Sequence, residues 1–141
     1  MTPNPQLRAQ DLSEGVIVMG KICIVDQDLA SRGFLRECLE REGHQVVTLD
    51  SDKALGSFLD AIPFDGYILS VDAPGVREKD LLRHLRKTQK SRILLVVSER
   101  GDAFLKEAID LGVYGFIYKP FDTHEICAMV THLVASCVPQ G

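Results

Sequence analysis

The chain has 141 residues, a length that suits one domain around one hydrophobic core. Its net charge of −4 argues against a nucleic-acid-binding surface, because phosphate binding requires clustered lysine and arginine. No apolar run approaches the ~20 residues that span a bilayer, and the apolar residues 16–19 are too few for a secretory signal. We therefore expect a cytoplasmic protein that binds neither a membrane nor nucleic acid directly.

Five short apolar runs predict the strands of a parallel sheet. Each run is four or five residues long, a length typical of buried strands. The third contains Tyr67, Ile68 and Leu69, ends at Ser70 and is followed by the turn signal Pro74-Gly75. The other four are residues 21–25, 45–49, 93–97 and 115–118.

Five segments between and after these runs have helical periodicity. Asp28 is a good N-cap for the first of them and Gly43 a good residue to follow its end. We expect Phe34 of the first helix and Ile109 of the fourth to face the core, because both lie in an apolar stripe. The expected helices are residues 29–42, 51–59, 78–88, 101–110 and 122–137.

Strands alternating with helices predict an α/β fold with helices on both faces of a parallel sheet. Right-handed crossovers favour a doubly wound, flavodoxin-like (βα)5 arrangement with strand order 2-1-3-4-5. The expected organisation is a flexible tail at 1–20, one domain at 21–137, and a tail or the start of a linker at 138–141. The four cysteines lack metal-ligand spacing, so we interpret them as buried apolar residues.

The carboxyl ends of the predicted strands bring four polar residues to one crevice. Asp26 follows the first strand, Ser70 ends the third, Ser98 follows the fourth and Lys119 follows the fifth. In an open α/β sheet this edge is where ligands and chemistry collect.

At this point the chain resembles a response-regulator receiver domain of two-component phosphorelay signalling, from about residue 21 to residue 135. The matching pieces are Ile24-Val25-Asp26, Gly43, Ala54-Leu55, Pro74, Ser98, Gly112 and the run Gly-Phe-Ile-Tyr-Lys-Pro-Phe at 115–121. The resemblance implies that Ser70 occupies the position of the phosphorylated aspartate, four residues before Pro74. It also implies that Asp26 and Gln27 occupy the positions of the acid pair that helps to hold magnesium.

Two of the three family acids are therefore absent, which predicts a degenerate receiver, or pseudo-receiver. An acyl phosphate requires a carboxylate nucleophile, and magnesium is a hard ion that prefers carboxylate oxygens. We expect no phosphorylation at Ser70, weak or no magnesium binding, no other cofactor and no enzymatic activity. Asp26 is the only retained candidate metal ligand. A crevice without net charge could instead close on itself through an Asp26–Lys119 pair and hydrogen bonds from Gln27, Ser70 and Ser98.

Several alternatives remain open at this stage. Asp72 is a candidate non-standard phosphoacceptor, although a solvated loop acid is the better interpretation. Asp26 is either a leftover ligand or a structural partner of Lys119. A remote alternative, a flavodoxin-like cofactor binder or enzyme, is disfavoured because no glycine-rich phosphate loop follows the first strand.

Phe116 and Tyr118 lie on one side of the fifth strand by its two-residue period. The resemblance implies that this surface, formed by the fourth helix, fifth strand and fifth helix, forms homodimers or docks partners; the alternative is that both rings are partly buried by the fourth helix. The expected function is thus phosphorylation-independent protein–protein interaction with other signalling proteins or an output domain.

Overall fold

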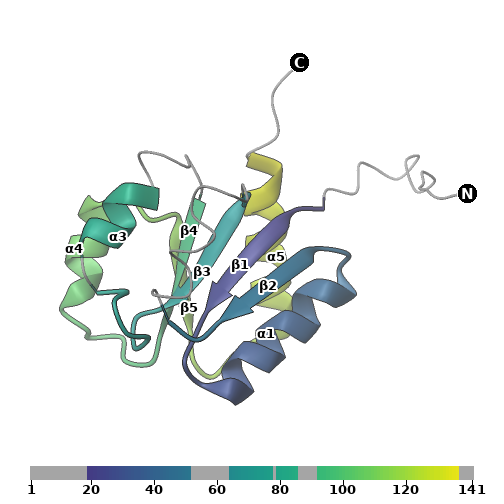
Figure 1. The fold of residues 1–141 in the computed structure, drawn as a ribbon, viewed down its shortest axis with the longest axis horizontal. Helices are drawn as coiled ribbons and strands as arrows, with labels where there is room; N and C mark the ends of the chain where they lie inside the picture. The colour runs from purple at the N-terminus through teal and green to yellow at the C-terminus, as the bar shows by residue number, and fades with distance from the viewer. Residues whose placement is uncertain (1–18, 52–63, 78, 86–91, 137–141) are drawn as a thin grey trace, which may run out of the picture.

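A computed structural model of the chain describes residues 19–51, 64–77, 79–85 and 92–136. Its centre is a sheet of five parallel strands in the order β2-β1-β3-β4-β5 (Figure 1). The predicted strand order is therefore confirmed. The strands are β1 (Lys21–Val25), β2 (Gln45–Leu49), β3 (Gly66–Ser70), β4 (Arg92–Val97) and β5 (Gly115–Tyr118).

Helices cover both faces of the sheet. The helices α1 (Leu29–Arg41) and α5 (Thr123–Ser136) share one apolar cluster with the sheet, and α3 (Lys79–His84) and α4 (Phe104–Asp110) share the other (Figure 1). Burial on both faces explains why the inner strands read as unbroken apolar runs. The helix predicted at 51–59 lies outside the described residues, and none of the described helices is long and apolar enough to cross a membrane.

The predicted ends of α1 are confirmed by local geometry. The side chain of Asp28 accepts a hydrogen bond from the backbone N–H of Ala30, which makes Asp28 the N-cap. Gly43 follows the helix with a φ of 95°, a left-handed conformation that a side chain would strain. These two residues direct the chain from β1 into α1 and from α1 into β2.

Two predictions about helix faces are wrong. Phe34 is 39% exposed and Ile109 is 60% exposed, although both were expected in the core. Phe34 stacks on Phe121, with ring centroids 5.4 Å apart. It therefore packs against the segment before α5, and part of its ring stays exposed to solvent. Ile109 lies on the outer side of α4, because Leu105 and Ala108 already bury the inner side of this short helix.

The helix α4 is shorter than predicted, because it begins at Phe104, three residues later than expected from the sequence. The helix predicted at 78–88 is described over Lys79–His84, and residue 78 and residues 86–88 lie outside the described residues. Ahead of α4, the carboxylate of Asp102 accepts a hydrogen bond from the backbone N–H of Phe104 at 2.9 Å. This side-chain bond takes the place of a helical turn at the predicted start.

Candidate functional site

The crevice predicted from the sequence lies at the carboxyl ends of β1, β3, β4 and β5. Val25 pairs with Leu69 across the central strands, so Asp26 and Ser70 follow directly at neighbouring positions of the same edge. Ser98 follows β4 and Lys119 follows β5. The parallel topology thus gathers side chains that are up to 93 positions apart, which is the separation between Asp26 and Lys119 (119 − 26).

Asp26 is held in place through its backbone and one carboxylate oxygen. Its Oδ1 accepts a hydrogen bond from the backbone N–H of Asp28 at 2.9 Å, and its carbonyl accepts one from Nη1 of Arg32 at 2.9 Å. The residue is 1% exposed, and its Oδ2 has no hydrogen-bond partner among the described residues. The pKa of Asp26 is raised, because burial raises it by more than the hydrogen bond from the Asp28 N–H and the ammonium of Lys119 together lower it.

Ser70 ends β3 as a buried hydroxyl, 1% exposed. Its Oγ accepts a hydrogen bond from the backbone N–H of Asp72 at 3.2 Å, an interaction that folds the loop after β3 back over the strand end. This position therefore offers a hydroxyl, which needs an activating base to act as a nucleophile. The hydroxyl serves as an acceptor within its own loop.

Lys119 has a different partner from the one expected. Its Nζ lies 3.8 Å from Oδ2 of Asp28, so the predicted direct pair between Asp26 and Lys119 is wrong. Asp28 reaches toward Lys119 while it caps α1, and Ser31 Oγ donates to the same carboxylate at 2.7 Å. That hydroxyl is the main cause of a lowered pKa of Asp28. The ammonium of Lys119 also lies 5.8 Å from the ring centroid of Phe121, next to a cis peptide bond between Lys119 and Pro120.

Ser98 does not bond to Ser70 or Asp26; it donates a hydrogen bond to Asp72. The distance between Ser98 Oγ and Asp72 Oδ2 is 3.1 Å. The other oxygen of Asp72 lies 3.4 Å from Nη2 of Arg77. Asp72 was expected to be a solvated loop acid, and its side chain is 45% exposed, but it links the loop after β3 to the end of β4.

Sequence reasoning missed three residues around the crevice. Arg32 holds the carbonyl of Asp26, and Arg77 forms a two-bond ion pair with Asp102 at 2.6 and 2.8 Å. Arg77 and Asp102 are 25 positions apart, and no periodic pattern connects a loop arginine with an acid in another loop.

The predicted switch and interface residues are partly buried. Phe116 and Tyr118 pack against the cluster that includes α4, with ring centroids 6.3 Å apart. The guanidinium of Arg100 lies 4.0 Å from the ring centroid of Tyr118. Gln27 is exposed. Whether the surface around Phe116 and Tyr118 binds another chain stays a prediction.

The crevice offers one buried carboxylate to a magnesium ion. The ion takes a near-octahedral shell of oxygens and is usually bound through more than one charged group. Here the buried carboxylate is that of Asp26, and one of its oxygens is committed to the N–H of Asp28. The carboxylate of Asp28 is committed to Ser31 and the cap of α1. Within the described part of the chain, no group of three or more histidine, cysteine, aspartate or glutamate residues has the geometry of a metal site.

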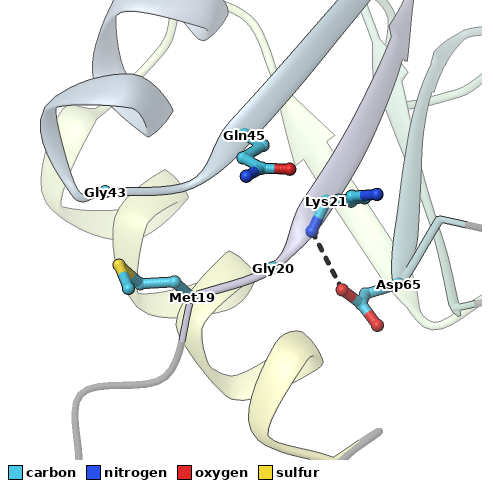
Figure 2. A pocket seen from close by; sticks show the side chains of 6 residues that line it. All are labelled: Met19, Gly20, Lys21, Gly43, Gln45 and Asp65. Carbon is cyan, nitrogen blue, oxygen red and sulfur yellow. Dashed lines mark hydrogen bonds between the residues drawn. The ribbon is translucent and has the colours of Figure 1, made fainter.

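A separate hollow lies at the opposite end of the sheet, where β1 and β2 begin (Figure 2). It is lined by Met19, Gly20, Lys21, Gly43, Gln45 and Asp65. The backbone N–H of Lys21 donates to Oδ2 of Asp65 at 2.9 Å across one side of it. None of the crevice residues contributes to this hollow, so it offers no ligand site to the crevice.

The fold, the crevice and the sequence define the same class of protein. Residues 22–131 match the model of the response regulator receiver domain, and the chain belongs to that family. The resemblance stated from the motifs is thereby confirmed, as is a role as a receiver domain in two-component signalling.

Among similar proteins is the transcriptional regulatory protein FixJ of Bradyrhizobium diazoefficiens, 32% identical over 124 residues, which cover 85% of this chain and 59% of the relative. The transcriptional regulatory protein CpxR of Escherichia coli is 30% identical over 113 residues, which cover 79% of this chain and 48% of the relative. The chain therefore spans about half to three fifths of the length of these relatives.

Solved structures share the fold. Full-length FixJ from B. japonicum has a TM-score of 0.78 at 26% identity, over 85% of this chain and 60% of that one. The chemotaxis response regulator CheY4 of Vibrio cholerae has a TM-score of 0.73 at 20% identity, over 82% of this chain and 98% of that one. The flavodoxin-like α/β arrangement is thus confirmed by both comparisons.

Proposed function

We propose that this receiver domain signals through protein–protein interaction and without a phosphoaspartate at position 70. The observation that carries the proposal is Ser70, which ends β3 where the family places its phosphoacceptor and whose Oγ accepts the backbone N–H of Asp72. A buried hydroxyl without a general base is a poor nucleophile toward a phosphodonor. Within the described part of the chain, no histidine and no carboxylate oxygen forms a hydrogen bond with the Ser70 hydroxyl.

The charge distribution supports the same proposal. The carboxylate of Asp26 is the one acid of the family's three that remains, and among the described residues Lys119 pairs with the carboxylate of Asp28. A phosphoryl group brings two negative charges and is held in the family by a metal and a lysine. With Gln27 and Ser70 in place of acids, the attraction for the metal falls, so magnesium binding is weak or absent.

The signalling partners follow from the family and from the span of the chain. The relatives FixJ and CpxR are named transcriptional regulatory proteins and are longer than the region that this chain matches. We propose that this domain acts on an output domain or on other cytoplasmic signalling proteins, and that it is not itself an enzyme. The acidic net charge of −4 favours a protein partner over nucleic acid for this domain.

A second candidate is a receiver that is phosphorylated at Asp72. The observation in its favour is that the Asp72 carboxylate is 45% exposed and lies 3.1 Å from the hydroxyl of Ser98. In the family, the residue at the position of Ser98 binds phosphoryl oxygens. Against this candidate, Asp72 stands two residues beyond the end of β3, and its oxygens are already bonded to Ser98 and Arg77.

Intact-mass spectrometry after incubation with acetyl phosphate and magnesium separates these candidates. We expect no phosphoryl adduct on the wild-type protein. The matched control is the double variant Gln27→Asp/Ser70→Asp, which restores both missing acids, and we expect it to acquire one adduct under the same conditions. If the wild type acquires an adduct that Asp72→Asn abolishes, the second candidate is correct and the proposal is refuted.

A further inference from the structure

Four side chains connect the two loops that border the crevice with the start of α4. Ser98 bonds to Asp72, Asp72 contacts Arg77, and Arg77 forms two bonds to Asp102. We call these residues the Asp72–Arg77 network. Its segments come from the loop after β3, the end of β4 and the turn before α4, so the network crosses from one loop to the other.

The end of the network is a helix cap. Oδ1 of Asp102 accepts hydrogen bonds from Nη1 of Arg77 at 2.8 Å and from the backbone N–H of Phe104 at 2.9 Å. The carboxylate is 14% exposed, and its bond to Arg77 is the main cause of a lowered pKa of Asp102. The guanidinium also lies 5.8 Å from the ring centroid of Phe104. Arg77 therefore touches both the cap and the first residue of α4.

The helix α4 depends on such contacts for its position. It has seven residues, and isolated helices shorter than ~12 residues are marginal in water. Ala103, which precedes it, supplies no side-chain cap. Phe104, Leu105 and Ala108 bury one side, while Ile109 leaves a large apolar side chain 60% exposed. A short helix with one buried side belongs to the least stable part of a fold and is the element that contacts at its end can shift.

We propose that the Asp72–Arg77 network acts as a lock that holds α4 in one position. Within this network, the carboxylate of Asp72 is the negatively charged group that accepts the hydrogen bond of Ser98. A bidentate pair between guanidinium and carboxylate fixes geometry as well as distance, because two parallel bonds prevent rotation. Breaking the network loosens the first turn of α4 and with it the outer surface that carries Ile109. The network regulates that surface without a covalent change to the protein.

This inference rests on the proposed function, because a phosphoryl group in the crevice would compete with Asp72 for the hydroxyl of Ser98. The two are nevertheless tested separately. The proposed function is tested by adding a phosphodonor, whereas the lock is tested in its absence.

The test is amide hydrogen exchange of the free protein, followed for Phe104–Asp110 and, as internal references, for Leu29–Arg41 and Thr123–Ser136. We expect Arg77→Gln to speed exchange in α4 by about fivefold, the size that a partly exposed ion pair supports, and to leave α1 and α5 unchanged. Arg77→Lys keeps the positive charge but cannot form the two parallel bonds to the Asp102 carboxylate, so it should also speed exchange in α4. The matched control is Arg36→Gln, which removes the same charge from an exposed pair with Glu40 on α1 and should leave α4 unchanged.

Asp72→Asn provides the second arm. It removes the negative charge that contacts both Ser98 and Arg77. We expect faster exchange in α4, although Asp72 lies in a different loop and is linked to that helix through Arg77. The inference is overturned if both Arg77→Gln and Asp72→Asn exchange in α4 at the wild-type rate. It is also overturned if exchange rises equally in α1, α4 and α5, because that pattern means global destabilisation. If the wild type cannot be phosphorylated and α4 is nevertheless unaffected by these variants, the proposed function stands and the lock does not.

Discussion

Replacing Asp26 by asparagine should stabilise the domain at neutral pH. Asp26 is 1% exposed, and its Oδ2 has no hydrogen-bond partner among the described residues. An unpaired buried polar atom costs about 1–3 kcal/mol, and an ionised one costs more than an amide. Asparagine keeps Oδ1 as the acceptor for the Asp28 N–H and removes the buried charge, at the loss of some attraction to Lys119. We therefore expect the free energy of unfolding to rise by about 1 kcal/mol.

The pH dependence of this gain has a definite sign. Burial raises the pKa of Asp26 in the folded state above its ordinary value of 3.8, so the folded protein binds this proton more readily than the unfolded chain. The wild type accordingly gains stability as the pH falls toward the raised pKa, whereas the asparagine variant does not. The advantage of Asp26→Asn should be largest near neutral pH and should shrink under acid conditions.

Urea unfolding followed by circular dichroism at about pH 7 and about pH 5 measures both quantities. Asp28→Asn is the matched control, because asparagine caps a helix as well as aspartate does. The pKa of Asp28 is lowered, mainly by Ser31, so this control should be slightly less stable than the wild type. Its deficit should be the same at about pH 7 and about pH 5, because the wild type loses this advantage only as the pH falls through 3.8 toward the lowered pKa. The reasoning about Asp26 is refuted if Asp26→Asn is less stable than the wild type at about pH 7, or if its advantage is the same at both pH values.

Two further predictions concern stability. His44 is 5% exposed and its Nδ1 accepts the backbone N–H of Gly20, and burial lowers its pKa from 6.5. Because the unfolded chain then binds the proton more readily, the free energy of unfolding of the wild type should fall as the pH drops below about 6.5. Urea titrations should show a smaller fall in His44→Gln. An equal fall in both proteins would contradict the role given to His44. Gly33→Ala should raise the free energy of unfolding by about 1 kcal/mol, and with it the melting temperature. The reason is that Gly33 is an exposed helix residue and an added Cβ there meets nothing within 4 Å. The opposite result is expected for Gly66→Ala, where the added Cβ would lie 2.6 Å from Leu133 Cδ2, and equal effects of the two variants would refute the contact argument.

Crowding at β3 is the reason to expect opposite effects of alanine at Gly66 and Gly33. Gly66 lies in the central strand with α5 packed over it, and Leu133 fills the space where a side chain would be. Gly33 lies on the outer side of α1, where the sequence could have carried any helix former. The same residue type is thus required in one place and merely tolerated in the other.

The sequence predicts elements and their ends well in this protein, because those signals are local. The bounds of β1, β2 and β5 agree with the predictions, as do the cap at Asp28 and the left-handed Gly43. An apolar run of four to six residues needs burial on both faces whatever surrounds it, and alternation with helices leaves few topologies. The serine at the end of β3 and the crevice at the strand ends follow from the same order of elements.

The side-chain partners in the crevice were decided by the tertiary structure. The ion-pair contact of Lys119 is with Asp28, while Asp26 feels only its charge, and Asp72 joins Ser98 to Arg77. Each of these contacts joins loops that are distant in the chain, and its geometry depends on how far each loop extends beyond its strand. Periodicity carries no information about that distance. For the same reason the exposure of Phe34 and Ile109 could not be read from their helical spacing, because what lies over a helix face depends on neighbours from other elements.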